Sequence, residues 1–80
     1  MEPPQIVPRG PLPPYRQIAE WLQGRIEAGD FGPLDPLPSE KELMQIFGVA
    51  RETARRAVRY LAERELIVVI PGRGSYVKRP

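Results

Sequence analysis

Three arginines and one glutamate lie within ten residues near the middle of the chain, in the stretch VARETARRAV, residues 49–58. A guanidinium group donates paired hydrogen bonds whose geometry matches phosphate groups and the edge of guanine. On a helix, Arg51 and Arg55 point the same way because they are four residues apart, so both can reach guanine O6 and N7. Arg56 and Arg59 lie further round the helix, where backbone phosphates suit them. The stretch therefore predicts a surface that binds a polyanion.

Glu52 is an acidic residue inside this basic stretch. A carboxylate in the first helical turn favours the helix dipole, and it can pair with Arg55 or Arg56 three or four residues on. A nearby nucleic acid would repel it unless it accepts a hydrogen bond, and cytosine N4 is the base-edge donor that suits it. Two hypotheses stay open beside the dipole role: Glu52 orients Arg56, or it reads a cytosine. Thr53, the next residue, can donate to a phosphate.

Charge is unevenly distributed along the chain. Residues 1–50 carry four basic and seven acidic side chains, a net charge of −3, whereas residues 51–80 carry eight basic and three acidic ones, a net charge of +5. Ten of the twelve cations are arginine. A basic half of a small domain indicates a polyanionic partner. A solvated basic face gives the same excess, so charge alone leaves both interpretations open.

The composition argues against catalysis and against export. The chain has no cysteine and no histidine, which excludes disulfides, thiol chemistry, zinc fingers and the commonest general base. Ser39 and Ser75 lack a histidine to activate them. We therefore expect no enzyme, no catalytic residue, no cofactor and no metal site. No apolar run is long enough to span a membrane, and the first ten residues do not resemble a signal peptide, so we expect a cytoplasmic protein.

The elements that must position these residues follow from proline, glycine and apolar spacing. Residues 1–13 are proline-rich and predict a flexible, extended arm, so we expect the folded domain to span residues 14–80. A first helix is predicted over about 15–28 from apolar residues at helical spacing, with Gly29 just past its end. In PSEKEL, Ser39 and Glu42 form a capping box that begins a second helix.

The second helix is predicted to end at Gly48, and after the short break GVA a third helix runs from Arg51 to about residue 64. The β-branched run LIVVI, the turn PGRG and the run SYV then predict a hairpin with a four-residue tip. This order predicts a mainly α fold with a small β-hairpin, a winged helix-turn-helix of three helices plus a two-stranded wing. The second helix of a helix-turn-helix, which is the third predicted helix of this chain, enters the major groove of DNA.

The wing tip is the second candidate contact. Gly72 and Gly74 permit a tight turn, and Arg73 between them would project into a minor groove. A plain hairpin turn has the same residues, and only its place after a helix-turn-helix favours a wing.

The run LPSEKELMQIFGVARETARRAVRYLAERELIVVIPGRGSYV resembles the N-terminal winged-helix domain of GntR-family bacterial transcription regulators, and the similarity covers about residues 12–78. The resemblance implies that the chain contacts DNA through residues of the second helix, the third helix and the wing. These are Lys41, Arg51, Thr53, Arg55, Gly72 and Arg73. For the pair Ser39–Glu40 it implies a structural role.

The chain departs from the family pattern at three positions. Ala50 stands where Ser or Thr is usual, which removes the side-chain cap of the third helix at a cost of about 1 kcal/mol. Glu52 replaces a small polar residue, so the preferred operator differs from that of relatives. Glu65 replaces a glycine, so we expect the third helix to end differently or to carry left-handed backbone strain.

We therefore expect sequence-specific binding of double-stranded DNA in transcriptional regulation, by a GntR-like repressor. Its candidate DNA-binding residues are Lys41, Arg51, Glu52, Thr53, Arg55, Arg56, Arg59, Gly72, Arg73 and Gly74. Helix-turn-helix proteins pair on half-sites, so the expected partner is a two-fold symmetric operator bound by a homodimer, with no membrane and with residence at the nucleoid. The alternative is a winged helix used for protein–protein interaction, which would place apolar anchors on the outer face of the third helix.

Overall fold

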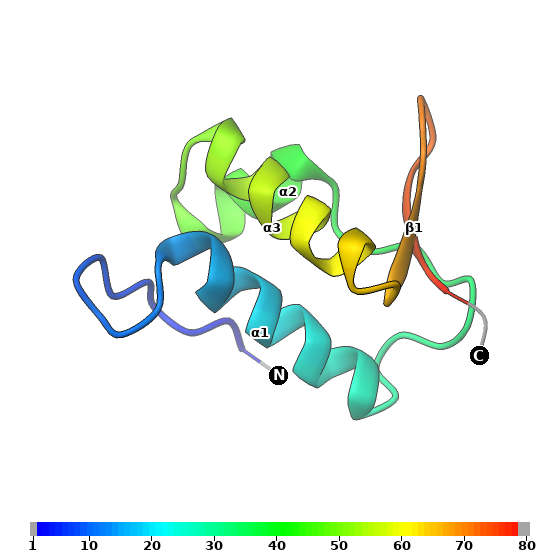
Figure 1. The fold of residues 1–80 in the computed structure, drawn as a ribbon, viewed down its shortest axis with the longest axis horizontal. Coiled ribbons are helices and arrows are strands. Elements are labelled where there is room, and N and C mark those ends of the chain that lie inside the picture. Colours follow the sequence, from blue (N-terminus) through cyan, green and yellow to red (C-terminus); the bar gives the residue numbers. More distant parts are fainter. Residues whose placement is uncertain (1, 79–80) are drawn as a thin grey trace.

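The structure is a computed structural model that describes residues 2–78. Three helices precede a two-stranded antiparallel hairpin, in the order α1 (Pro14–Glu27), α2 (Glu40–Phe47), α3 (Arg51–Glu63), β1 (Ile67–Ile70) and β2 (Gly74–Val77). Figure 1 shows the hairpin standing upright beside the last turn of α3. These elements confirm the predicted winged helix-turn-helix. None of the helices in residues 2–78 is long and apolar enough to cross a membrane.

The helix ends follow the capping rules that the sequence indicates. Pro14 is the first residue of α1, where its missing N–H costs nothing. The capping box of α2 is complete, because Ser39 Oγ accepts from the Glu42 N–H at 3.0 Å while Glu42 Oε1 accepts from the Ser39 N–H at 2.8 Å. Gly29 and Gly48 adopt φ values of 86° and 65° beyond α1 and α2. α2 therefore ends at the predicted Gly48, and α1 ends at Glu27, one residue before the predicted end, with Gly29 just beyond.

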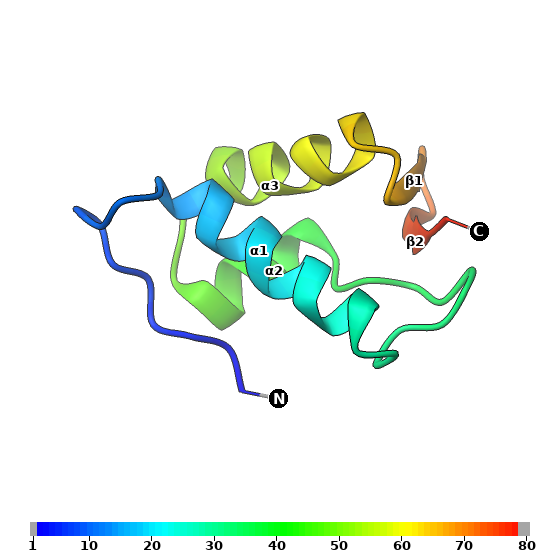
Figure 2. The same cartoon turned by 60° about the horizontal axis from the view of Figure 1, so that its bottom comes forward.

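α3 is the central helix of the core. It packs against both α1 and α2, and Figure 2 shows it lying over α1. Ala54 and Ala57 are fully buried, and their small side chains let the helices approach closely. The side chains that fill the centre come from all three helices; the largest fully buried ones are Ile18, Leu22, Leu43 and Leu61.

The hairpin pairs β1 with β2 in the register Ile67↔Val77 to Ile70↔Gly74. Gly74 is therefore a strand residue, and the predicted four-residue tip is wrong by one position. The tip closes over three residues because the Arg73 N–H donates to the Ile70 carbonyl at 2.9 Å. Ile67 and Val77 turn into the core and anchor the base of the wing.

The loop between α1 and α2 pairs with the edge of β2 that β1 leaves free, a contact that the sequence does not indicate. Pro36 makes an isolated antiparallel bridge with Tyr76, and the Leu37 N–H donates to the Ser75 carbonyl at 2.9 Å. The Leu37 side chain is buried in the core. β2 is thus bonded on both edges, which fixes the direction of the wing relative to the helices.

The proline-rich segment folds back against α1 and the core. Gln17 Nε2 donates to the Val7 and Leu12 carbonyls at 2.8 and 2.7 Å, while its Oε1 accepts from the Val7 N–H at 2.9 Å. Ile6 packs, partly buried, against the core. The predicted boundary between residues 13 and 14 coincides with the start of α1, and the flexibility of the arm stays a prediction. The predicted ranges also include Met1, Arg79 and Pro80, which lie outside the described residues.

Candidate nucleic-acid interface

The first two arginines of α3 share one carboxylate of α2. Arg51 Nη1 lies 3.5 Å from Glu40 Oε1, and Arg55 Nε lies 3.6 Å from Glu40 Oε2. Glu40 is the first residue of α2, and the capping box at Ser39 determines where that helix begins. Because each oxygen takes a different arginine, Glu40 holds both guanidinium groups at the junction of the two helices. Their remaining N–H groups stay available to a ligand.

Glu52 forms two further pairs along α3. Its Oε2 lies 3.8 Å from Arg55 Nη1, and its Oε1 lies 3.9 Å from Arg59 Nη2. The predicted pairing with Arg55 is confirmed, whereas the hypothesis that Glu52 orients Arg56 is wrong. The side chain of Glu52 is 64% exposed and that of Glu40 is 32% exposed, so the pairs of Glu52 are the weaker and more easily exchanged ones.

Arg56 turns away from this network towards α1. Its guanidinium lies over the ring of Tyr15, 4.1 Å from the centroid. The reason is helical geometry, since each residue advances about 100° and Arg56 lies one step beyond Arg55. The sequence grouped Arg56 with Arg59, whereas in the structure Arg59 joins the network of Arg51 and Arg55. Arg51, Arg55 and Arg59 share carboxylates with one another, and Arg56 stacks separately.

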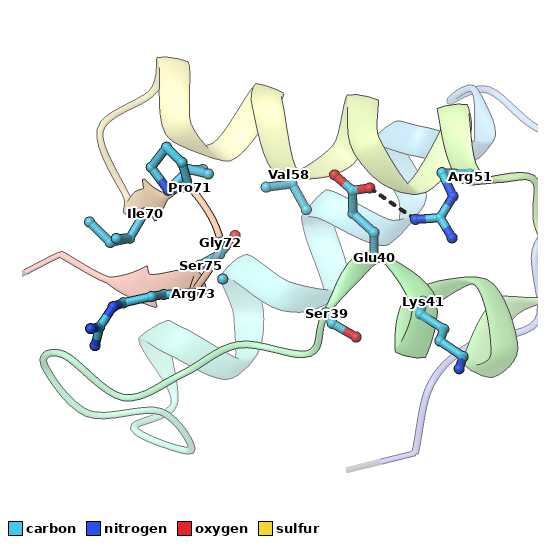
Figure 3. Close-up of a pocket in the computed structure, with 12 residues that line it drawn as sticks. Ser39, Glu40, Lys41, Arg51, Val58, Ile70, Pro71, Gly72, Arg73 and Ser75 are labelled. Atoms are coloured by element: carbon cyan, nitrogen blue, oxygen red, sulfur yellow. Dashed lines mark ion pairs between the residues drawn. The ribbon is translucent and has the colours of Figure 1, made fainter.

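A groove of about 420 Å³ lies between the start of α2, α3 and the wing. It brings together predicted residues that are far apart in the chain, namely Lys41, Arg51, Gly72, Arg73 and Gly74. Figure 3 shows Glu40 and Arg51 facing one another on one side, with Arg73 extending from the wing tip on the other.

A smaller hollow of about 280 Å³ continues along α3 and includes Arg55 and Arg59. It shares Glu40, Val58 and Val69 with the groove. The two together are called the α3–wing surface below. Eight of the ten candidate residues lie on this surface or, in the case of Glu52, pair with arginines that line it.

The wing tip needs glycine for its backbone. Gly72 and Gly74 have φ values of 77° and 119°, which side chains with a Cβ rarely adopt. Apart from the glycine itself and its two chain neighbours, no heavy atom of the described residues lies within 4 Å of where a Cβ would stand at either position, so the space beside them is open. The Tyr76 hydroxyl donates to the Arg73 carbonyl at 3.2 Å and steadies the turn, while the Arg73 side chain stays exposed.

Two candidate residues have plainer surroundings. Lys41 is exposed in the first turn of α2, and within residues 2–78 it forms no ion pair. Thr53 is half-buried in the first turn of α3, and it lines neither hollow of the α3–wing surface.

Glu40 is the residue whose part in the site the sequence does not reveal. Its place directly after the capping serine indicates a role at the start of the helix. Residue spacing along the chain does not show which side chains of two different helices lie close together. The one indication is indirect, because a very short α2–α3 turn must bring the first residues of both helices into proximity.

Comparison with protein families and curated sequences agrees with this geometry. The family model for bacterial regulatory proteins of the gntR family matches residues 14–77. The mannosyl-D-glycerate transport/metabolism system repressor MngR of Escherichia coli K12 is 45% identical over 69 residues, 86% of this chain and 29% of that protein. The repressor NagR of Bacillus subtilis is 40% identical over 72 residues, 90% of this chain and 30% of that protein. The chain thus spans less than a third of the length of these relatives.

Solved structures show the same arrangement of elements. AraR(DBD) in complex with operator ORX1 superposes with a TM-score of 0.86 at 34% identity, over 96% of this chain and 98% of that one. The GntR-family transcription factor YtrA from Sulfolobus acidocaldarius superposes with a TM-score of 0.85 at 34% identity, over 95% of this chain and 80% of that one.

Proposed function

The chain belongs to the GntR family of bacterial regulatory proteins, and on that premise we propose that it binds double-stranded DNA sequence-specifically and represses transcription. The α3–wing surface carries the proposal, because Lys41, Arg51 and Arg73 from three elements line one groove. The similar domain AraR(DBD) was solved in complex with an operator, which supports DNA binding by this chain. The family and its relatives are regulators, and we propose no catalytic activity.

In the proposed complex α3 lies in the major groove. Arg51 and Arg55 read guanine edges, and each bidentate contact discriminates by about 1–3 kcal/mol. The shared carboxylate of Glu40 supports this assignment, because it aligns both side chains before DNA arrives. Arg59 contacts a phosphate from the adjoining part of the helix. Glu52, which pairs with Arg55 in the free protein, remains the candidate for reading a cytosine.

The other candidate residues position the domain on the duplex. Lys41 and Thr53 contact phosphates at the edge of the major groove. Gly72 and Gly74 let the wing tip approach the sugar-phosphate wall, and Arg73 enters the minor groove. Arg56 contacts a phosphate beyond the end of this surface.

The proposed assembly is a homodimer on a two-fold symmetric operator, because a single small module seldom reaches useful specificity and helix-turn-helix domains pair on half-sites. The proposed location is the cytoplasm, at the nucleoid. Residues 1–13 are proposed to be a flexible arm beside a DNA-binding domain of residues 14–80.

Selection from a random duplex library at about 150 mM salt tests this function. We expect a two-fold symmetric motif with guanines at fixed positions. Duplexes that bind only at low salt without enrichment would contradict sequence-specific binding by this chain. Such a result would favour a basic face that serves another partner.

Two single variants test the assigned roles on the selected operator. Arg55→Ala is expected to relax the preference at one base pair, because it removes a base contact. Arg59→Ala is expected to weaken all duplexes alike and to lower the slope of log K against log salt by about one unit. Fluorescence anisotropy over a salt series measures both. Equal losses on every sequence for the two variants would contradict the division of roles.

A further inference from the structure

A second cluster of aromatic and cationic side chains lies where α1 packs against α3. The rings of Tyr15 and Tyr60 meet edge to face with centroids 6.1 Å apart. Arg56 lies over Tyr15 at 4.1 Å, while Arg16 and Arg64 lie 4.5 and 5.3 Å from the centroid of Tyr60. The two tyrosines, Arg16 and Arg64 have no part in the function proposed above. The cluster therefore gathers three guanidinium groups around two aromatic rings.

Tyr15, Arg56 and Tyr60 of this cluster line a partly open pocket of about 200 Å³ with a mostly polar lining. Arg56 forms no ion pair with any carboxylate of residues 2–78, so its charge is free to meet an external anion. The Tyr60 hydroxyl accepts from Arg64 Nη1 at 3.2 Å, which leaves its own proton to donate. The residues that line the pocket are Tyr15, Arg56, Arg59, Tyr60 and Glu63.

Stacking prepares Arg56 for binding. A long side chain held against a ring loses less conformational entropy when it binds than a freely rotating one. The ring also screens one face of the guanidinium from water while the N–H groups at its edge stay available to an acceptor. Glu63 is the one acidic residue of the lining, and Arg59 is already paired with Glu52. The positive charge here comes from Arg56 and from Arg64 beside Tyr60, neither of which forms an ion pair within residues 2–78. The pocket therefore suits a single negative charge with several acceptor oxygens.

The position of the pocket identifies the source of that charge. Arg59 lines both this pocket and the α3–wing surface, so the two are continuous along the exposed side of α3. A duplex with α3 in its major groove continues past the end of the α3–wing surface. We propose that Tyr15, Arg56 and Tyr60 bind one phosphodiester group of the DNA backbone, outside the base pairs read by α3. This inference rests on the proposed DNA binding and adds α1 to the interface.

Neutral phosphate substitution tests the inference directly. A series of duplexes, each with one methylphosphonate linkage, is bound to the wild-type chain and to Arg56→Gln. We expect one linkage outside the base-read region whose neutralisation weakens the wild-type chain several-fold and leaves Arg56→Gln unaffected. The salt slope of Arg56→Gln is expected to fall by about 0.9 unit, the value for one lost phosphate contact. An identical linkage profile for both proteins overturns the proposal.

Arg25→Gln is the matched control. Arg25 also stacks on aromatic rings, at 4.8 Å from Trp21 and 4.5 Å from Phe31, but it lies at the other end of α1 and pairs with Asp30. It is expected to leave the linkage profile and the salt slope unchanged. If Arg25→Gln loses as much affinity and salt slope as Arg56→Gln, any stacked arginine contributes through net charge alone, and the proposed phosphate site is wrong.

Tyr15 variants test the role of α1 separately. Tyr15→Phe keeps the ring under Arg56 and is expected to keep most of the affinity, whereas Tyr15→Leu removes the ring and is expected to lose part of what Arg56→Gln loses. Circular dichroism confirms that each variant folds. A folded Tyr15→Leu protein with wild-type affinity and salt slope overturns the role of α1.

The two proposals fail in different ways. If library selection yields no motif, sequence-specific binding fails, while the linkage series and salt slopes can still be measured on any duplex that binds. If a motif is selected and Arg56→Gln matches the wild-type chain throughout, DNA recognition stands and the α1 phosphate site is wrong.

Discussion

At the scale of the residue, Glu40 is the least expected member of the site, because it places a negative charge in the middle of the surface proposed to bind DNA. Its two pairs, with Arg51 and Arg55, are partly exposed, and such pairs contribute about 0.2–1 kcal/mol each. They add little to stability. In the proposed complex they act on binding as well, since they lower the general attraction to phosphates while leaving the outer N–H groups of both arginines to read bases.

Replacement of Glu40 by its neutral isostere is therefore expected to reduce specificity rather than binding. Glu40→Gln should bind unrelated duplexes about two- to fivefold more tightly, which corresponds to about 0.4–1 kcal/mol, within the range expected for the release of its two weak pairs. The ratio of operator to unrelated affinity should fall. Competition titration of labelled operator with unrelated duplex measures that ratio.

Glu27→Gln is the control for Glu40→Gln, because it removes the same charge from the far end of α1, where Glu27 accepts a hydrogen bond from Gln23 and pairs with no cation of residues 2–78. It is expected to leave the ratio unchanged. If both variants tighten non-specific binding equally, the effect belongs to net charge and not to the placement of Glu40.

At the scale of the element, α3 is held by its buried face more than by its ends. Ala50 precedes the helix without any side-chain cap. Glu65, two residues past the end, has a φ of 62°, which confirms the left-handed strain predicted there. The Glu65 carboxylate pairs with Lys78 at 3.1 Å, but this side chain is 79% exposed, so the pair offsets little of that strain.

Glu65→Gly is expected to stabilise the domain. Left-handed backbone costs a residue with a Cβ roughly 1–2 kcal/mol, and the greater freedom of glycine in the unfolded chain removes part of the gain. A net gain of about 0.5–1 kcal/mol raises Tm by about 2–8 °C in a domain of this size. Thermal unfolding followed by circular dichroism measures it. Glu65→Ala, which removes the same pair but keeps the Cβ, should not be stabilised, and an equal gain for both variants would count against the strain.

At the scale of the whole molecule, size restricts how two copies can share an operator. The domain measures 34 × 27 × 21 Å, and its longest dimension is about one helical turn of B-DNA. Two domains on one face of the duplex therefore need half-sites separated by whole turns, and a half-turn change places them on opposite faces.

Operator spacing consequently tests the proposed dimer. Insertion of about five base pairs between the half-sites is expected to abolish cooperative binding, whereas insertion of about ten should place both copies on one face again. Gel-shift titrations that resolve singly and doubly bound duplex measure cooperativity. If every spacing shows the same independent binding, the copies do not interact on DNA and the proposed homodimer is wrong.

The local structure of this protein was determined by the sequence alone. Capping at Ser39, the left-handed glycines at 29 and 48, and apolar spacing within each helix act over a few residues, so they predict where the elements begin and end. The hairpin followed from β-branched runs around a glycine turn, with an error of one residue at Gly74. The cations of α3 were predicted for the same reason, because their spacing on one helix follows from its pitch.

Only the tertiary structure decided which side chains meet across elements. Glu40 pairs with Arg51 and Arg55 from another helix. Tyr15 of α1 lies under Arg56 of α3, and Pro36 forms a β-bridge with Tyr76 of the wing. These contacts depend on how the buried faces of the helices dock, and docking is determined by the packing of side chains distant in the chain. A periodic pattern states which face of a helix is buried, but it does not state which neighbour covers that face.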